Sequence, residues 1–150
     1  MSAIVNTTEL QLKNALIAAL KDAISAGELP EGDIPSFIIE VPGDRTHGDL
    51  ASNVAMVSAK AFRSAPRKIA ECIVSHLNLE GTFFEKAEIA GPGFINFFLN
   101  DKYYADIVSD VIDSGENYGR SNFGEGKKVL VEFVSANPTG PMHIGNARGG

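Results

Sequence analysis

The side chains best suited to chemistry gather near the carboxyl end of the sequence. Glu132, Ser135 and Asn137 come close together, and His143 and Asn146 follow, three residues apart. A spacing of three places an imidazole and a carboxamide on one face of a helical turn. A polar loop that leads into a helix N-terminus offers a phosphate both free N–H groups and a favourable dipole. These residues therefore predict a nucleotide site.

The elements that must position these side chains are predicted by the same stretch. Val129–Val134 is short, apolar and rich in β-branched residues, which predicts a buried strand. Residues 135–140 are turn formers, and Pro141 stands where a helix is expected to start, because proline lacks the N–H that a first turn leaves unpaired. Gly145 leaves room for a ring or a ribose to come close. We expect a strand, a tight loop and a helix start in this order.

This stretch also resembles a known family. Glu-Phe-Val-Ser-Ala-Asn-Pro-Thr-Gly-Pro at 132–141, followed by His-Ile-Gly-Asn at 143–146, resembles the signature of the arginyl-tRNA synthetases, which are class I aminoacyl-tRNA synthetases. Two further segments, 47–56 and 89–97, resemble parts of that family's amino-terminal domain. One departure is plain, because Asn146 stands where the motif has a second His. Asparagine can donate a hydrogen bond to an oxygen, but it cannot carry a charge.

The resemblance implies a two-step reaction with L-arginine, ATP and tRNA(Arg). The arginine carboxylate attacks the α-phosphate of ATP, which forms arginyl-adenylate and releases pyrophosphate, and the terminal ribose of the tRNA then accepts the arginyl group. ATP and Mg²⁺ are the implied cofactors, with Mg²⁺ bound chiefly through the phosphates. The resemblance assigns His143 and Asn146 to catalysis, Glu132, Ser135 and Asn137 to arginine binding, and Pro141, His143, Gly145 and Asn146 to ATP binding.

Charge is unevenly distributed along the sequence. The net charge is −6, yet residues 117–150 hold four Lys/Arg against two Asp/Glu, whereas residues 1–116 hold nine against seventeen. Four basic residues within the acidic part form a cluster that predicts a tRNA contact, since an RNA backbone needs local basic patches rather than a basic total. A solvated helix face accounts for them about equally well. The cluster consists of Lys60, Arg63, Arg67 and Lys68.

Other features limit the class of protein. No apolar run approaches the roughly 18–20 residues that span a membrane, and the first residues lack the pattern of a secretory signal. No Cys/His cluster has the spacing of a metal site. The single cysteine, Cys72, excludes an internal disulfide and fits a reducing cytosol, so we expect a cytoplasmic protein. His47 has the side chain of a catalytic base, but no acid or nucleophile surrounds it in a hydrolase pattern, which favours a structural role.

Hydrophobic periodicity predicts an α+β fold for residues 1–115. We expect two layers, with a small and mostly antiparallel sheet and helices on one face. Phe94, Phe97 and Phe98 have rings that can stack on bases, but core packing is expected for at least two of them. The predicted helices are 8–26, 50–61, 64–77 and 102–114, and the predicted strands are 36–41, 83–90 and 94–99.

The sequence is predicted to divide into three parts. Residues 1–115 form the amino-terminal domain, which in the resembled family contacts the tRNA around its D-loop. Residues 116–127, with three glycines and little periodicity, form a linker, and residues 128–150 begin a Rossmann-type catalytic domain. A strand, a loop and one helical turn cannot complete a nucleotide-binding sheet. We therefore expect an inactive amino-terminal part of a longer, monomeric arginine–tRNA ligase. Residues 129–150 are expected to be frayed, or to pair with another molecule through the exposed strand edge.

Two other classes of function fit parts of the sequence. One is an RNA-binding module without catalysis, because the remainder of the ATP site is absent. The other is a small-molecule nucleotidylyltransferase, since such enzymes also use a His-x-Gly motif. They usually carry it near the start of the chain, whereas here about 140 residues precede it.

Overall fold

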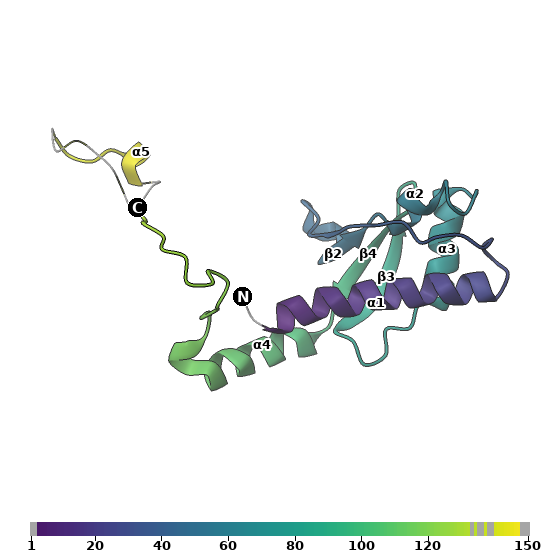
Figure 1. Cartoon of the computed structure of the whole chain (residues 1–150), viewed down its shortest axis with the longest axis horizontal. Helices are drawn as coiled ribbons and strands as arrows, with labels where there is room; N and C mark the ends of the chain where they lie inside the picture. The colour runs from purple at the N-terminus through teal and green to yellow at the C-terminus, as the bar shows by residue number, and fades with distance from the viewer. Residues whose placement is uncertain (1–2, 133, 135–136, 138–139, 148–150) are drawn as a thin grey trace. The chain divides into compact units, whose positions relative to one another are not determined.

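A computed structural model describes residues 3–132, 134, 137 and 140–147 (Figure 1). The side chains of residues 3, 146 and 147 lie outside this description. The chain divides into two compact units, Met1–Gly119 and Arg120–Gly150. The first unit contains a sheet and its helices. The second contains one short helix, α5 (Ile144–Ala147), among its described residues.

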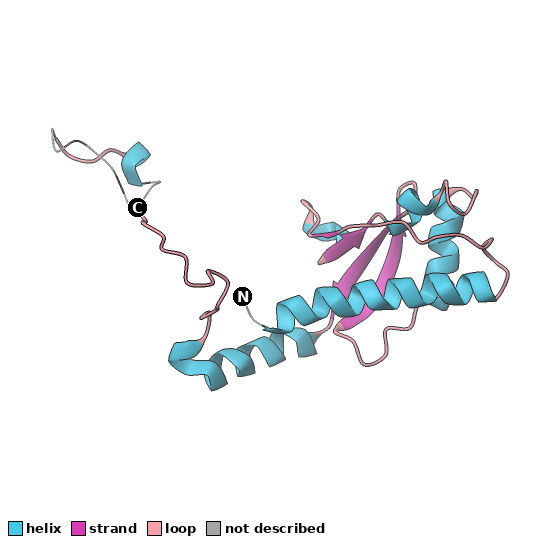
Figure 2. Ribbon diagram, viewed as in Figure 1, coloured by secondary structure: helices cyan, strands magenta, loops and turns pink. Residues whose placement is uncertain are grey.

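The first unit is built on a four-stranded antiparallel sheet of order β1-β2-β4-β3 (Figure 2). In the sequence α1 precedes the sheet, α2 and α3 lie between β2 and β3, and α4 follows β4, while two 3₁₀ turns, η1 and η2, precede β2 and follow α4. This confirms the predicted small antiparallel sheet with helices. The strands are β1 (Ile39–Glu40), β2 (Leu50–Ser52), β3 (Phe84–Ala90) and β4 (Phe94–Leu99), and the helices are α1 (Ala3–Ser25), η1 (Arg45–His47), α2 (Val54–Ser58), α3 (Pro66–His76), α4 (Asp101–Ser114) and η2 (Gly115–Asn117).

One apolar core joins the helices to one face of the sheet. Leucines of α1 repeat every four residues and meet the apolar stripe of α3. Alternate residues of β4 reach the same cluster, because successive side chains of a strand point to opposite faces. The fully buried members include Leu12, Leu16, Leu20, Ile69, Ile73, Ile95 and Phe97.

The predicted helix over 50–61 is wrong in its first part. Leu50–Ser52 forms β2 instead, and α2 begins only at Val54. Gly48 has φ +85°, and a Cβ there would lie 2.7 Å from the Phe97 carbonyl oxygen, so the chain runs directly against β4. The Asp49 N–H donates to that same oxygen at 2.9 Å, and the Asp49 carboxylate accepts the Leu99 N–H at 2.8 Å. These contacts hold Leu50–Ser52 beside β4, where the three residues pair as a strand.

The predicted strand over 36–41 is shorter than expected, since only Ile39 and Glu40 pair with β2. The backbone N–H and carbonyl of Ile38, the residue before β1, form hydrogen bonds with side chains and not with another strand. The Ile38 N–H donates to Asn53 Oδ1 at 3.0 Å, and the Ser52 hydroxyl donates to the Ile38 carbonyl at 3.1 Å. Ser52 Oγ also accepts the Val54 N–H, which ties the start of α2 to the same point.

The remaining predictions for the first unit are close to the structure. The strands predicted at 83–90 and 94–99 are confirmed and pair as a hairpin, and α4 is capped by Asn100, whose Oδ1 accepts the Tyr103 N–H at 3.2 Å. Thr8 was predicted to begin α1, but the helix starts at Ala3. The Thr8 hydroxyl is buried within the helix and donates to the Ile4 carbonyl at 2.7 Å.

The second unit differs from its prediction. Among the described residues of 129–134 there is no strand, and Val129, Leu130 and Val131 are largely exposed. Strand pairing needs a neighbouring strand, and the described part of this unit provides none. The helix predicted to start at Pro141 starts at Ile144. The predicted Rossmann-type domain therefore stays a prediction.

Candidate functional site

The predicted nucleotide site lies in the second unit. Glu132, Asn137 and Pro141 are exposed. Ser135 lies outside the described residues, as does the side chain of Asn146. The structure therefore leaves the assignment of these residues to arginine and ATP as a prediction.

His143 and Gly145 are brought together at the start of α5. The Gly145 N–H donates to His143 Nδ1 at 3.1 Å. A Cβ at Gly145 would lie 2.9 Å from His143 Cε1, so any other residue here would have to displace the imidazole. The prediction that Gly145 leaves room for the ring or ribose of a nucleotide stays a prediction. With Nδ1 accepting, a neutral imidazole carries its proton on Nε2.

A second candidate surface is the face of the sheet opposite the core, here called the open face. The register places Glu40, Ala51, Asn96 and Glu88 in one row across the four strands. Ala90 pairs with Phe94 on one side of this row, and Lys86 pairs with Phe98 on the other. Paired residues of antiparallel strands point to the same face, so all of these side chains belong to the open face.

A groove of about 450 Å³ lies on the open face, towards the end that carries the β3–β4 turn. The segment that leads through η1 borders it together with the β3–β4 turn, and Asn96 and Phe94 contribute from β4. The Asp44 carboxylate accepts hydrogen bonds from the backbone N–H and the hydroxyl of Thr46, and these bonds hold the pKa of Asp44 below its ordinary value. The lining residues are Glu40, Pro42, Gly43, His47, Ala51, Ala90, Gly91, Phe94 and Asn96.

Asn96 is the polar centre of this groove. Its residue is only 6% exposed, yet among the described residues no hydrogen bond to its carboxamide occurs. A carboxamide offers two donors and an acceptor, which is the pattern that reads the edge of a base. Asn96 is therefore free to bond a ligand that enters the groove.

The three phenylalanines of β4 lie on opposite faces of the sheet, one on the core side and two on the open face. Phe97 is fully buried in the core, whereas Phe94 and Phe98 are half-buried on the open face. The expectation that at least two of them belong to the core is wrong. Lys86 Nζ lies 4.0 Å from the centroid of the Phe98 ring and 2.8 Å from Glu88 Oε1. Two aromatic rings on an open sheet face are suited to stacking on bases.

The predicted basic cluster borders the open face through the β3–β4 turn. Arg67 Nη1 donates to the carbonyl of Gly91 at 3.2 Å, and Gly91 lines the groove. A Cβ at Gly93 would lie 2.8 Å from Pro66 Cβ, so the turn is seated on the start of α3. Arg67 also pairs with Glu71 at 3.5 Å. Lys60, Arg63 and Lys68 are exposed, and the described residues offer them no ion pair.

Cys72 shows no sign of chemistry. Burial, and then the neighbouring Glu28 carboxylate, raise the pKa of its thiol above the ordinary value. A raised pKa keeps the thiol protonated, and the thiolate is the reactive form, so Cys72 is better explained as a packing residue. Among the described residues no group of three or more His, Cys, Asp or Glu can hold a metal ion. In the same residues, no helix has the length and apolar character needed to cross a membrane.

The alternation of side chains in β4 indicates Asn96, although Asn96 is not among the predicted site residues. Within Phe94–Leu99 a period of two places Phe94, Asn96 and Phe98 on one face and Ile95, Phe97 and Leu99 on the other. The polar residue therefore marks the open face. Ala51 carried no such signal, because the strand that contains it was predicted to be a helix.

Comparisons with known proteins identify relatives of the chain. The family model for the arginyl tRNA synthetase N terminal domain matches residues 10–99. An arginine–tRNA ligase of Caldanaerobacter subterraneus subsp. tengcongensis is 52% identical over 150 residues, which is 100% of this chain and 27% of that protein. An arginine–tRNA ligase of Bacillus subtilis is 48% identical over 140 residues, or 93% of this chain and 25% of that protein.

A solved structure has a similar fold. The crystal structure of arginyl-tRNA synthetase from Plasmodium falciparum matches 93% of this chain and 25% of its own, with a TM-score of 0.54 and 21% sequence identity. At that identity the likeness concerns the fold. The chain thus spans about a quarter of the length of the curated relatives that it matches.

Proposed function

The chain belongs to the arginyl-tRNA synthetase N-terminal domain family, and on that premise we propose that its first unit is the tRNA-contacting part of an arginine–tRNA ligase. Its relatives named above are arginine–tRNA ligases, which supports this assignment. The observation that carries the tRNA contact is the continuity between the groove of the open face and the basic cluster, which Arg67 joins by its bond to Gly91.

This surface has the two parts that binding of unpaired RNA requires. The groove offers a free carboxamide, Asn96, beside the ring of Phe94, so an unstacked base can stack and bond by its edge. The basic cluster offers exposed cations for the phosphates on either side of that base. The carboxylate of Glu40 lines the groove and disfavours a phosphate there, which leaves this position to a base.

For the whole protein we propose ATP-dependent activation of L-arginine and its transfer to tRNA(Arg). In this proposal Glu132 and Asn137 hold the arginine, with the carboxylate of Glu132 facing a cationic end of the substrate. Ser135 bonds the same substrate. His143 donates to the ATP phosphates as charge builds in the transition state, and Asn146 contributes a neutral donor beside it.

The other parts of the ATP site follow the same proposal. Pro141 shapes the start of the ATP-binding helix, and Gly145 packs beneath the adenosine. In the same proposal Mg²⁺ accompanies the ATP and is held chiefly by its phosphates. We also propose a cytoplasmic, monomeric enzyme.

RNA binding is tested with the 150-residue chain and a tRNA(Arg) transcript. Lys60→Glu and Lys68→Glu are each expected to weaken binding about tenfold and to reduce the slope of log Kd against log salt by about one. Lys102→Glu makes the same change of charge on α4 and serves as the matched control. Asn96→Ser is expected to weaken binding without changing the salt slope. Equal effects of all four substitutions would contradict the proposed surface.

Activity is tested by replacing the aligned quarter of the Bacillus subtilis relative with this chain. ATP–pyrophosphate exchange is then measured with each amino acid, with and without tRNA. We expect exchange with arginine only, reduced at least about a hundredfold by His143→Ala. Exchange with another amino acid would overturn the arginine assignment. Loss of all exchange in a folded chimera that still binds tRNA would leave an RNA-binding module.

A further inference from the structure

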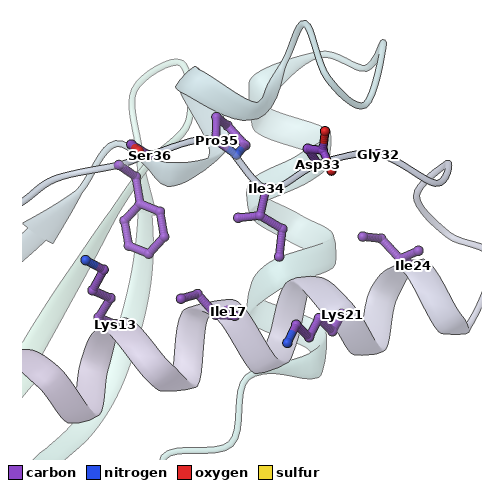
Figure 3. A pocket seen from close by; sticks show the side chains of 10 residues that line it. Lys13, Ile17, Lys21, Ile24, Gly32, Asp33, Ile34, Pro35 and Ser36 are labelled. Carbon is purple, nitrogen blue, oxygen red and sulfur yellow. The ribbon is translucent and has the colours of Figure 1, made fainter.

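A second groove, here called the α1 groove, lies between α1 and the extended segment 32–37 beside it (Figure 3). Its volume is about 530 Å³. Ile17 and Ile24 line it from α1, and Ile34 points from the segment towards the helix. These side chains and Phe37 are half-buried, so their outer surfaces form an apolar floor that solvent reaches.

The outer wall of the α1 groove is anchored at both ends. Leu29 is 3% exposed and anchors the chain just after α1. At the other end the Ile38 N–H donates to Asn53 Oδ1 at 3.0 Å. Between them, Gly32 lies beside the α2–α3 connection, where a Cβ would be 3.4 Å from the Ala61 carbonyl oxygen. The path of the segment is therefore set by contacts outside the groove.

Two lysines border this apolar floor. Lys13 and Lys21 are eight residues apart on α1, a rise of about 12 Å along the helix, and both line the groove. In the part of the chain that the structure describes, neither has an ion pair, and Asp33, which also lines the groove, pairs with neither of them. In a chain of net charge −6 this leaves a local excess of positive charge beside an apolar surface.

We propose that the α1 groove binds a small apolar carboxylate, with its hydrocarbon part against Ile17, Ile24 and Ile34 and its anionic group at the lysines. The volume lies within the range of small-molecule sites, which are mostly apolar with a few polar groups that fix orientation. A protein partner would need about 800 Å² on each side, which favours a small ligand for a groove of this size. The α1 groove shares no lining residue with the groove of the open face, so this site is independent of the proposed tRNA contact.

The test uses decanoate, below its micelle concentration, and the 150-residue chain with labelled isoleucine methyl groups. Decanoate is expected to shift the methyl signals of Ile17, Ile24 and Ile34 saturably, while that of Ile95 in the core stays in place. Lys13→Gln combined with Lys21→Gln retains most of each side chain and should weaken binding at least about tenfold. The matched control, Lys127→Gln with Lys128→Gln, should leave the affinity unchanged. Decyltrimethylammonium, with the same chain and the opposite charge, should not bind saturably.

Three results would overturn the proposal. One is equal binding of decanoate and decyltrimethylammonium, which would indicate a merely apolar surface. Another is unchanged affinity after both lysines are replaced. The last is binding of an acidic amphipathic peptide in the α1 groove while decanoate causes no shift, which would make the groove a protein interface.

Discussion

Two apolar runs of six residues, Phe94–Leu99 and Val129–Val134, are alike as sequence and different as structure. The first is β4, paired on both sides and packed on α1 and α3. The described residues of the second form no strand, and most of them are exposed. Apolar, β-branched composition is therefore insufficient, because a strand is stabilised by its pairing partners and by the layer that covers it.

Amide exchange gives the largest expected contrast between the two runs. We expect the paired amides of β4 to exchange at least about a thousandfold more slowly than those of Val129, Leu130 and Val131, because they open only with the whole unit. The measurement is hydrogen–deuterium exchange followed by NMR in a dilute sample. Strong protection of 129–131 in a monomer would break the comparison.

Truncation of one large side chain in each run should show the same contrast in stability. Phe97 is 0% exposed and Leu130 is 98% exposed. We expect Phe97→Ala to lower the free energy of unfolding by about 3–5 kcal/mol, and Leu130→Ala to change it by less than about 0.5 kcal/mol. Urea denaturation measures both. A similar loss in the two variants would mean that the second run is packed after all.

The close approach of Gly48 to β4 can be tested by adding a single methyl group. Gly48→Ala places a Cβ 2.7 Å from the Phe97 carbonyl oxygen at a φ of +85°. We expect a loss of about 2–3 kcal/mol from strain and displacement. Gly43→Ala is the control, since a Cβ at Gly43 meets nothing within 4 Å. Equal stability of the two variants would show that β2 moves away from β4 at little cost.

Tyr104→Phe tests whether the contact between α4 and Asp49 stabilises the first unit. The Tyr104 hydroxyl donates to Asp49 Oδ1 at 3.2 Å, and burial, followed by the nearby Asp49 carboxylate, raises the pKa of Tyr104 above its ordinary 10.0. The protonated Tyr104 hydroxyl therefore contributes to the free energy of unfolding below pH 10.0, and this contribution is lost as the pH rises through the raised pKa. Because the side chain is half exposed, the substitution should cost at most about 1 kcal/mol at pH 7. Unfolding measured at pH 7 and above pH 10 should differ less for the variant, and an unchanged difference would exclude the contact.

Much of the fold could be predicted from the sequence because its signals are local. The apolar stripe Ile69, Ala70, Ile73 indicated α3, and the run Gly91-Pro-Gly93 indicated the turn of the hairpin. β2 escaped prediction because three residues are too few for a period. What makes Leu50–Ser52 a strand is its contact with β4, about 45 positions away in the sequence.

The candidate sites were predictable to different degrees. The basic cluster and the motif at 132–146 were recognised from residue types alone. The groove of the open face was not, because Glu40, Ala51 and Asn96 become neighbours only through the register of three strands. The α1 groove depends on the path of a loop, which carries no periodicity at all.

The bonds of Asp49 have a consequence for how the chain folds. Its carboxylate joins Leu99 and Tyr104, 50 and 55 residues further along the chain. Closing such long loops costs chain entropy before any bond compensates for it, whereas α1, α3 and the β3–β4 hairpin need only local contacts. We therefore expect the pairing of β2 with β4, on which the open face depends, to belong to the slower steps of folding.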